Sequence, residues 1–213
     1  MILASNLSYL LEAAVVTLAL SIASAILAAI IGVAIALLQI FGNVAARSLA
    51  RLYLYVVRGV PLLVLLFAMY YILPYAGINL SPLLGGIFVI AIYYAAFMAE
   101  VIRAAIIAVP RGQWDAARAV GMRPSLMLLT VIFPQAVRLA GPPLINTCIM
   151  LIKGTSLVSV IGIWELTMAG RQVVERTASV FQIFGGVAAI YFFICYGLSL
   201  YGRHLERRLR YEH

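Results

Sequence analysis

Long stretches without a charged residue limit what this chain can fold into. The stretches run from Glu12 to Arg47, from Arg58 to Glu100 and from Arg176 to Arg203. A helix of about 20 apolar residues crosses a bilayer, so each stretch can hold at least one membrane span. The whole chain is 65% hydrophobic and 10% charged, whereas soluble domains are about 25% charged. A soluble enzyme, a disordered chain and a disulfide-stapled secreted module are therefore excluded.

The apolar stretches predict an all-α membrane protein with five transmembrane helices in a single domain, residues 1–213. The stretch from Arg58 to Glu100 has room for two spans, and the turn-forming residues Pro74, Gly77, Asn79, Ser81 and Pro82 lie between them. A further apolar stretch, Pro142–Ile163, is interrupted only by Lys153. The five spans are expected at about residues 13–38, 60–75, 83–99, 142–163 and 180–200.

The basic residues predict the orientation of the spans. With the N-terminus outside and the C-terminus inside, 12 of the 15 basic residues fall in cytoplasmic segments, as the positive-inside rule requires. The net charge of +8 therefore reflects membrane orientation and gives no support for a nucleic-acid partner. No cleavable signal peptide is expected, because no basic segment precedes the first apolar run.

The cytoplasmic loop at about residues 104–138 has helical signals of its own. Pro110 is expected to separate the third span from a short helix at Gln113–Val120, which Gly121 ends as a C′ glycine. Pro124 and Ser125 then start another helix, with Ser125 as its cap, and this helix stays apolar until Pro134.

The short helix has the features of a docking element. Its small residues would let a partner approach closely, and polar side chains surround them: Ala116, Ala117 and Gly121, with Arg111, Asp115, Arg118 and Arg123. The alternative is an amphipathic helix lying on the membrane surface. The residues alone support both interpretations equally.

Polar residues inside the membrane are candidates for function. Lys153 lies in the fourth span and is followed by Gly154, Thr155 and Ser156, which indicate a local helix break lining a polar cavity. The alternative is a lysine that snorkels to an interface or pairs with a structural acid. Asn146 fits a structural or a pathway role equally well.

The remaining polar groups favour structural roles. Glu100 and Arg103 lie one helical turn apart and are expected to form an ion pair at the inner interface. Cys148 and Cys195 lie in apolar runs and are expected to pack as small hydrophobic residues. No metal-ligand spacing and no nucleophile–base pair stands out, so no catalytic or metal site is predicted.

Several segments resemble one family in order and spacing. Asp115-Ala116-Ala117, Gly121 and Val131-Ile132-Phe133-Pro134 resemble the EAA coupling motif of binding-protein-dependent ABC transporter permeases. Further segments resemble the histidine/glutamine-type permeases for polar amino acids: Arg58–Leu63, Ala96–Glu100, Pro110–Trp114, Pro134–Arg138, Pro142–Leu144, Lys153–Leu157 and Leu205–Arg208. The resemblance extends from about Leu7 to the C-terminal tail.

The resemblance implies a permease subunit of an amino acid importer in the bacterial inner membrane. Its partners would be a second permease subunit (the same or a sister chain), an ABC ATPase dimer and an extracytoplasmic amino acid-binding protein. ATP and Mg would bind to the ATPase. This chain has no GxxxxGK[ST] phosphate loop, so we expect no cofactor in it and no enzymatic activity of its own.

The resemblance also implies roles for individual residues. Coupling to the ATPase would fall to Arg111, Trp114, Asp115, Ala116, Ala117, Gly121 and Pro134. The substrate pathway would include Asn146, Lys153, Gly154, Thr155 and Ser156, and an inner gate or structural cluster would include Arg58, Glu100 and Arg103. Glu165, Arg171 and Glu175 fall in the outer loop before the last span, where a binding-protein contact and a solvated loop are equally good interpretations. Gly154 departs from the family, which commonly has an acid there, and this weakens the case for a cationic substrate.

A stand-alone secondary carrier or channel for a small polar solute is the alternative function. A carrier needs a coupling-ion site and usually has an internal repeat. Neither an acidic ion site within a span nor a repeat between the two halves is evident in the sequence.

Overall fold

The computed structural model describes the backbone of residues 2–210 and the side chains of residues 2–207. Every regular element in that part of the chain is helical, as the sequence predicts. The α-helices are α1 Ile2–Ser5, α2 Leu7–Phe41, α3 Val44–Gly59, α4 Leu62–Phe67, α5 Pro82–Ala108, α6 Arg111–Ala119, α7 Pro124–Met127, α8 Phe133–Gly154, α9 Leu166–Thr177 and α10 Val180–Arg210.

Four helical runs among the described residues are long and apolar enough to cross a membrane. They are Leu7–Phe41, Pro82–Ala108, Pro124–Ile161 and Val180–Arg207. A fifth candidate is the pair Val44–Gly59 and Leu62–Ala76, whose two halves are bent by 101°. The bend falls at Pro61, whose ring has no N–H to continue the helix. The predicted second span at 60–75 is thus the second half of a bent pair, and it ends in a π-turn (Ala68–Ile72) and a 3₁₀-turn (Leu73–Ala76).

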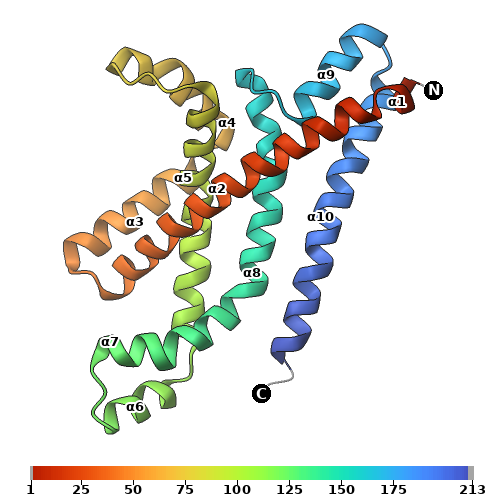
Figure 1. Ribbon diagram of the computed structural model, residues 1–213. Coiled ribbons are helices and arrows are strands. Elements are labelled where there is room, and N and C mark those ends of the chain that lie inside the picture. Colours follow the sequence, from red (N-terminus) through yellow and green to blue (C-terminus); the bar gives the residue numbers. More distant parts are fainter. Residues whose placement is uncertain (1, 211–213) are drawn as a thin grey trace.

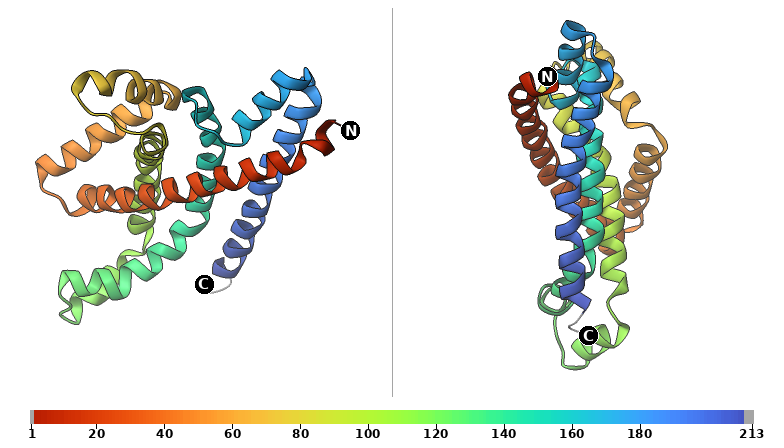
Figure 2. Two further views of the ribbon diagram at one scale, coloured as in Figure 1. Left: turned by 45° about the horizontal axis from the view of Figure 1, so that its top comes forward. Right: turned by 90° about the vertical axis from the view of Figure 1, so that its right-hand side faces the viewer.

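Helix α2 holds the bundle together by lying diagonally across α5 and α8 (Figures 1 and 2). Its small residues Ala28, Gly32 and Ala36 are spaced four apart and share its buried face. A Cβ atom at Gly32 would lie only 3.0 Å from Cβ of Met98 and 3.2 Å from the carbonyl oxygen of Ala95. Membrane helices associate through van der Waals contact between small residues, so this glycine sets how closely α2 and α5 approach.

The helix predicted to start at Pro124 and the span predicted at 142–163 form one continuous helical run. The start at Pro124 agrees with the sequence prediction, but helical structure does not stop at Pro134 and continues through Pro142 and Pro143. A π-helical turn at Leu128–Ile132 precedes Pro134, and such a turn accommodates the broken hydrogen-bond ladder. Pro124 occupies the first turn after Arg123, so the prediction that Ser125 caps this helix is wrong.

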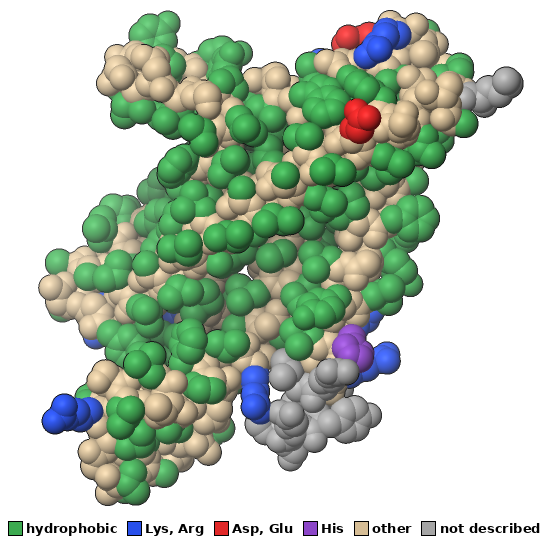
Figure 3. All heavy atoms as spheres, viewed as in Figure 1, with side chains coloured by type: hydrophobic (Ala, Val, Ile, Leu, Met, Phe, Trp, Pro, Cys, Tyr) green, Lys and Arg blue, Asp and Glu red, His purple; other side chains and the backbone are tan. Residues whose placement is uncertain are grey.

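The two ends of the molecule differ in the elements and the charged side chains that lie there. The start of α2, the whole of α9 and the turn before α5 lie at one end, whereas α6, α7 and the last turns of α10 lie at the other (Figures 1 and 2). The expected turn before α5 is present, with Gly77 at φ +78° and Ser81 capping α5. On the face drawn in Figure 3, acidic side chains gather at the α9 end, and basic ones predominate at the α6 end.

Replacing Gly32 with valine tests the α2–α5 contact. We expect Gly32→Val to destabilise the protein by about 1–3 kcal/mol, because overpacking a tight contact forces neighbouring atoms apart. The measurement is the midpoint of thermal unfolding in detergent. Gly197→Val is the matched control, since Gly197 is an exposed glycine within α10 and has no atom within 4 Å of its would-be Cβ. Equal midpoints for the two variants would show that the contact is not close enough to matter.

Candidate functional site

The predicted docking helix is α6, and both its ends are well defined. Pro110 precedes its first residue, Arg111. At the other end Gly121 has φ +75°, its N–H donates to the Arg118 carbonyl at 2.9 Å, and the N–H of Met122 donates to the Ala117 carbonyl at 3.1 Å. These two bonds are those of a Schellman motif. The sequence prediction of a C′ glycine at position 121 agrees with this geometry.

One face of α6 packs against the rest of the chain, and the other face is exposed. Ala117 is 5% exposed and belongs to the main hydrophobic core together with Met127. The prediction that Ala117 faces a partner is therefore wrong: its small side chain lets α6 lie close to the rest of this chain. Ala116, Arg111 and Asp115 are exposed, and Asp115 lies 3.6 Å from Arg118 in a surface ion pair.

Two contacts tie α6 to the helical run that follows it. Trp114 packs against the main core, and Gln135 Nε2 donates to Gln113 Oε1 at 3.3 Å. Pro134, the last residue of the coupling motif, is exposed beside Gln135 in the first turn of α8. A displacement of α6 would therefore reach α8 directly.

The polar residues expected in the pathway mark the end of α8. The helix ends at Gly154 and continues as a 3₁₀-turn over Thr155–Ile161, so the predicted local break is present. Thr155 is fully buried and its hydroxyl donates to the Ile152 carbonyl at 2.7 Å. The Ser156 hydroxyl donates to the Lys153 carbonyl at 2.8 Å. Thr155 has no exposed surface with which to line a cavity, which corrects the expectation for that residue. Ser156 is partly exposed, and its place in a substrate pathway remains a prediction.

Lys153 and Asn146 project from α8 as exposed side chains. Lys153 lies in the last turn of α8, where a positive charge interacts favourably with the helix dipole. In a span, an exposed lysine must meet a polar cavity, a lipid headgroup or another subunit. Their place in a substrate pathway remains a prediction.

Gly154 leaves room for a tyrosine from α5. A Cβ atom at this position would lie 3.1 Å from two ring carbons of Tyr94 and closer still to its hydroxyl oxygen. That hydroxyl donates to the Met150 carbonyl at 2.8 Å. The family commonly has an acid at position 154. In this chain the position is glycine, and the ring of Tyr94 fills the space that a side chain there would need.

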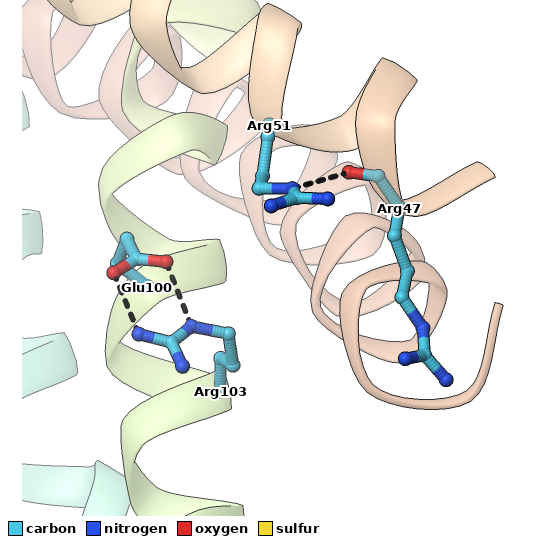
Figure 4. Close-up of polar contacts among 4 residues, drawn as sticks. All are labelled: Arg47, Arg51, Glu100 and Arg103. Atoms are coloured by element: carbon cyan, nitrogen blue, oxygen red, sulfur yellow. Dashed lines mark hydrogen bonds and ion pairs between the residues drawn. The ribbon is translucent and has the colours of Figure 1, made fainter. Parts of the chain in front are cut away.

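Glu100 and Arg103 form the ion pair that their spacing predicts. Arg103 donates through Nε and Nη2 to the two carboxylate oxygens at 2.9 and 3.1 Å (Figure 4). Arg58 reaches the same region from α3, with its guanidinium carbon 5.4 Å from the centre of the Phe97 ring. The three residues predicted as a structural cluster or inner gate therefore lie together.

Glu165 is a buried structural residue. It is 0% exposed, caps α9 by accepting from the Met168 N–H at 2.9 Å, and accepts from the Tyr191 hydroxyl of α10 at 2.8 Å. Thr17 of α2 completes the cluster by accepting from the Leu166 N–H at 3.0 Å. The expectation that Glu165 contacts a binding protein is corrected, because its carboxylate joins α2, α9 and α10 and has no exposed surface.

Arg171 and Glu175 are exposed on α9, and their contact with a binding protein remains a prediction. No pattern in the sequence indicates the neighbouring cluster around Tyr9. Its hydroxyl donates to Gln172 Oε1 and accepts from Trp164 Nε1 at 3.0 Å, and the Arg176 guanidinium lies 5.5 Å from the centre of its ring. Trp164 is thus a hydrogen-bond donor in this cluster.

Residues 28–211 match the family described as "Binding-protein-dependent transport system inner membrane component". The chain belongs to this family. It is therefore a transport subunit embedded in a membrane. Among the described residues, no group of three or more His, Cys, Asp or Glu side chains lies close enough together to hold a metal ion.

Several relatives match almost the whole chain, and their names are those of cystine, nopaline and glutamine permeases. The chain is 38% identical over 194 residues to the L-cystine transport system permease protein TcyB of Bacillus subtilis, covering 91% of this chain and 83% of the relative. It is 37% identical to the nopaline transport system permease protein NocM of Agrobacterium fabrum, with 89% and 83% covered. It is 33% identical to the glutamine transport system permease protein GlnP of Escherichia coli, with 94% and 93% covered.

Solved structures share the fold of this permease subunit. A chain from the structure titled "Crystal structure of an amino acid ABC transporter with histidines" superimposes with a TM-score of 0.91 at 33% identity, covering 97% of this chain and 96% of that one. A chain of the MetNI methionine ABC transporter in an inward-facing conformation has a TM-score of 0.80 at 21% identity, with 94% and 96% covered. The second likeness concerns the fold alone.

The buried Glu165 predicts a pH-dependent stability. Burial raises the pKa of its carboxyl, although hydrogen bonds to the carboxylate oppose the shift. The folded chain then keeps this proton at pH values where the unfolded chain has lost it. The resulting stabilisation is complete below the ordinary pKa of 4.5 and is lost as pH rises from there through the raised pKa.

We therefore expect the unfolding midpoint to fall more steeply with rising pH above 4.5 in the unmodified protein than in Glu165→Gln, whose side chain does not titrate. The measurement is thermal unfolding in detergent across a pH series. Glu175→Gln, on the exposed face of the same helix, is the control and should keep the slope of the unmodified protein. A Glu165→Gln variant with that same slope would contradict the assignment.

Proposed function

We propose that this permease subunit serves an ATP-driven importer for polar amino acids or related compounds. The names of its relatives, which include cystine, glutamine and nopaline permeases, support this substrate class. The pathway would form between two permease subunits. These would be two copies of this chain, or this chain and a sister chain. An extracytoplasmic binding protein would deliver the substrate, and ATP and Mg would bind to a separate ATPase dimer.

The geometry of α6 carries the coupling part of this proposal. It is a short helix at one end of the molecule, well defined at both ends, with one face packed on the core and the other exposed. ATP-driven closure of the ATPase dimer would move α6 as a rigid body, and its contacts with α7, with the π-turn Leu128–Ile132 and with Gln135 would pass the motion to the α7–α8 run. A two-state permease pair would then turn outward, and hydrolysis would reset it.

We further propose five spans with the N-terminus outside and the C-terminus inside, in a bacterial inner membrane. The bent α3–α4 pair counts as one span in this arrangement. The positive-inside rule supports it, because α3, α6 and the C-terminal tail contain nine of the 15 basic residues. The side chains of Arg208 and Arg210, which contribute to this count, lie outside the described residues.

The alternative is a secondary carrier, which would draw on an ion gradient. It would require an acidic residue free to bind a coupling ion in a span. Glu100, the acid of α5, is already held by two hydrogen bonds from Arg103. This pairing favours the ATP-driven proposal.

Cysteine labelling tests the proposed orientation. In a chain with Cys148 and Cys195 replaced by alanine, a single cysteine is placed at Asn79 or at Ala119, both of which are exposed. In intact cells we expect a membrane-impermeant maleimide to label position 79 and not position 119, and to label both after permeabilisation. Labelling of 119 alone in intact cells would reverse the orientation.

Uptake into proteoliposomes tests the function and the role of α6 together. The subunit is purified from its native membrane in mild detergent, and the ATPase that accompanies it is reconstituted with it and with the binding protein. We expect ATP-dependent uptake of an amino acid. Gly121→Ala should lower uptake by about fivefold or more, because alanine at a positive φ costs about 1–2 kcal/mol and distorts the α6 cap.

Gly112→Ala is the matched control, because this glycine lies in the first turn of α6 without a positive φ and with no atom within 4 Å of its would-be Cβ. It should transport at close to the unmodified rate. Normal uptake by Gly121→Ala would contradict the coupling role of the α6 cap but not the proposed importer function. A subunit that brings down no ATPase even after mild cross-linking, or that takes up solute on an ion gradient without ATP, would contradict the proposed function.

A further inference from the structure

A pocket of about 870 Å³ lies between the ends of α2, α3 and α5 at the arginine-rich side of the molecule. Arg47, Arg51 and Arg58 line it from α3, and Glu100 and Arg103 line it from α5. In Figure 4 Arg51 extends from α3 toward the Glu100–Arg103 pair on α5, whereas the side chain of Arg47 points away from that pair. The docking helix α6 and the end of α8 contribute no residue to its lining.

The spacing of the arginines explains why they share the pocket. Positions 47, 51 and 58 fall within about 40° of one another around a helix of 3.6 residues per turn. They form a stripe beside the buried residues Ala50 and Val57, which hold α3 against its neighbours. The pocket is therefore a product of helix geometry, because packing the apolar stripe of α3 inward presents these arginines together.

The positive charge of the pocket is not balanced within the chain. Glu100 is its only acidic lining residue and is already paired with Arg103, so the lining has three positive charges in excess. Arg47 uses Nε for the Gly42 carbonyl at 2.7 Å, and Arg51 uses Nε for the Arg47 carbonyl at 3.3 Å. Among the described residues, the terminal nitrogens of these two guanidinium groups have no hydrogen-bond partner.

Gln39 adds a further donor to the pocket. Its side-chain nitrogen, at the end of α2, is buried beside the Glu100 carboxylate, although no described residue accepts from it within hydrogen-bonding geometry. Guanidinium forks with free terminal nitrogens and a buried amide donor together match an oxyanion that can accept several hydrogen bonds at once.

We propose that this pocket binds a phosphate oxyanion, supplied by the headgroup of an anionic phospholipid. A soluble phosphate compound has the same chemistry, but the surroundings favour the lipid. The outer face of α3 beside the pocket is apolar and open, with Leu52, Tyr55 and Val56 exposed by 58%, 77% and 53%. A headgroup in the pocket would place its acyl chains along this face. Under the proposed orientation the lipid belongs to the cytoplasmic leaflet, where anionic headgroups attract basic segments.

A second copy of this chain is a poorer source of negative charge. The sequence has seven acidic residues in all, and outside the pocket only Asp115, Glu206 and Glu212 are expected on this side of the membrane. Asp115 already lies 3.6 Å from Arg118. A lipid headgroup is therefore a better source of the anion than a carboxylate from a partner copy.

Lipid retention by the full chain tests the proposal. The protein is placed in nanodiscs of phosphatidylcholine with a minor fraction of phosphatidylglycerol, and bound lipid is measured by native mass spectrometry after release. We expect the unmodified chain to retain phosphatidylglycerol selectively and Arg47→Gln/Arg51→Gln to retain at least about tenfold less, since two charge-assisted contacts are lost. Arg47→Lys/Arg51→Lys keeps the charge without the forks and should retain an intermediate amount.

The matched control is Arg203→Gln/Arg207→Gln, which removes two exposed arginines from the C-terminal tail. It should retain lipid like the unmodified chain, and unfolding midpoints verify that all variants are folded. Displacement of phosphatidylglycerol by millimolar inorganic phosphate would support the site but assign it to a soluble anion. Equal losses in both glutamine pairs would show a general charge effect and overturn the proposal. A pocket variant that no longer associates with a second subunit but keeps its lipid would also overturn the proposal.

Discussion

The close crossing of α2 over α5 is the contact on which the arrangement of the other helices depends. Lipid surrounds apolar side chains as well as another helix does, so membrane helices need close backbone approach to associate. Gly32 provides it, with Cβ of Met98 and the Ala95 carbonyl at its surface. Because α2 is long and diagonal, it also reaches α9, where Thr17 accepts from the Leu166 N–H. One helix thus connects the core of the bundle with the end opposite α6.

Breaks in the helices occur where their backbone groups find other partners. The 3₁₀-turn after Gly154 is capped by the hydroxyls of Thr155 and Ser156, and α9 begins on the buried carboxylate of Glu165. Uncapped polar backbone in a bilayer costs several kcal/mol per group. These side chains therefore allow changes of helix direction, Thr155 and Ser156 at the end of the fourth helical run and Glu165 at the start of α9, outside the spans. Their first task is structural, and any contact with a substrate would come in addition.

Local patterns in the sequence were enough for some features and not for others. The apolar runs, the short helix of the cytoplasmic loop and its C′ glycine at position 121 depend on neighbours in sequence, and the structure agrees with them. Glu165 looked like a loop residue because Thr17 and Tyr191, which bury it, lie 148 and 26 residues away. The burial of Ala117 and the bend of the α3–α4 pair likewise depend on tertiary packing. The spacing of hydrophobic residues along the sequence does not reveal that packing.

The contact between Gly154 and Tyr94 has a consequence for how this protein can diverge. The tyrosine ring fills the volume that any side chain at position 154 would need, and its hydroxyl is anchored to the Met150 carbonyl. An acid at position 154 is compatible with this backbone if the tyrosine ring moves aside and gives up its bond to Met150, or if the residue at 94 becomes smaller. The two positions, far apart in the chain but in contact in the fold, are therefore expected to covary in homologues, so that charge near the end of α8 is gained when the Tyr94–Met150 bond or bulk on α5 is given up.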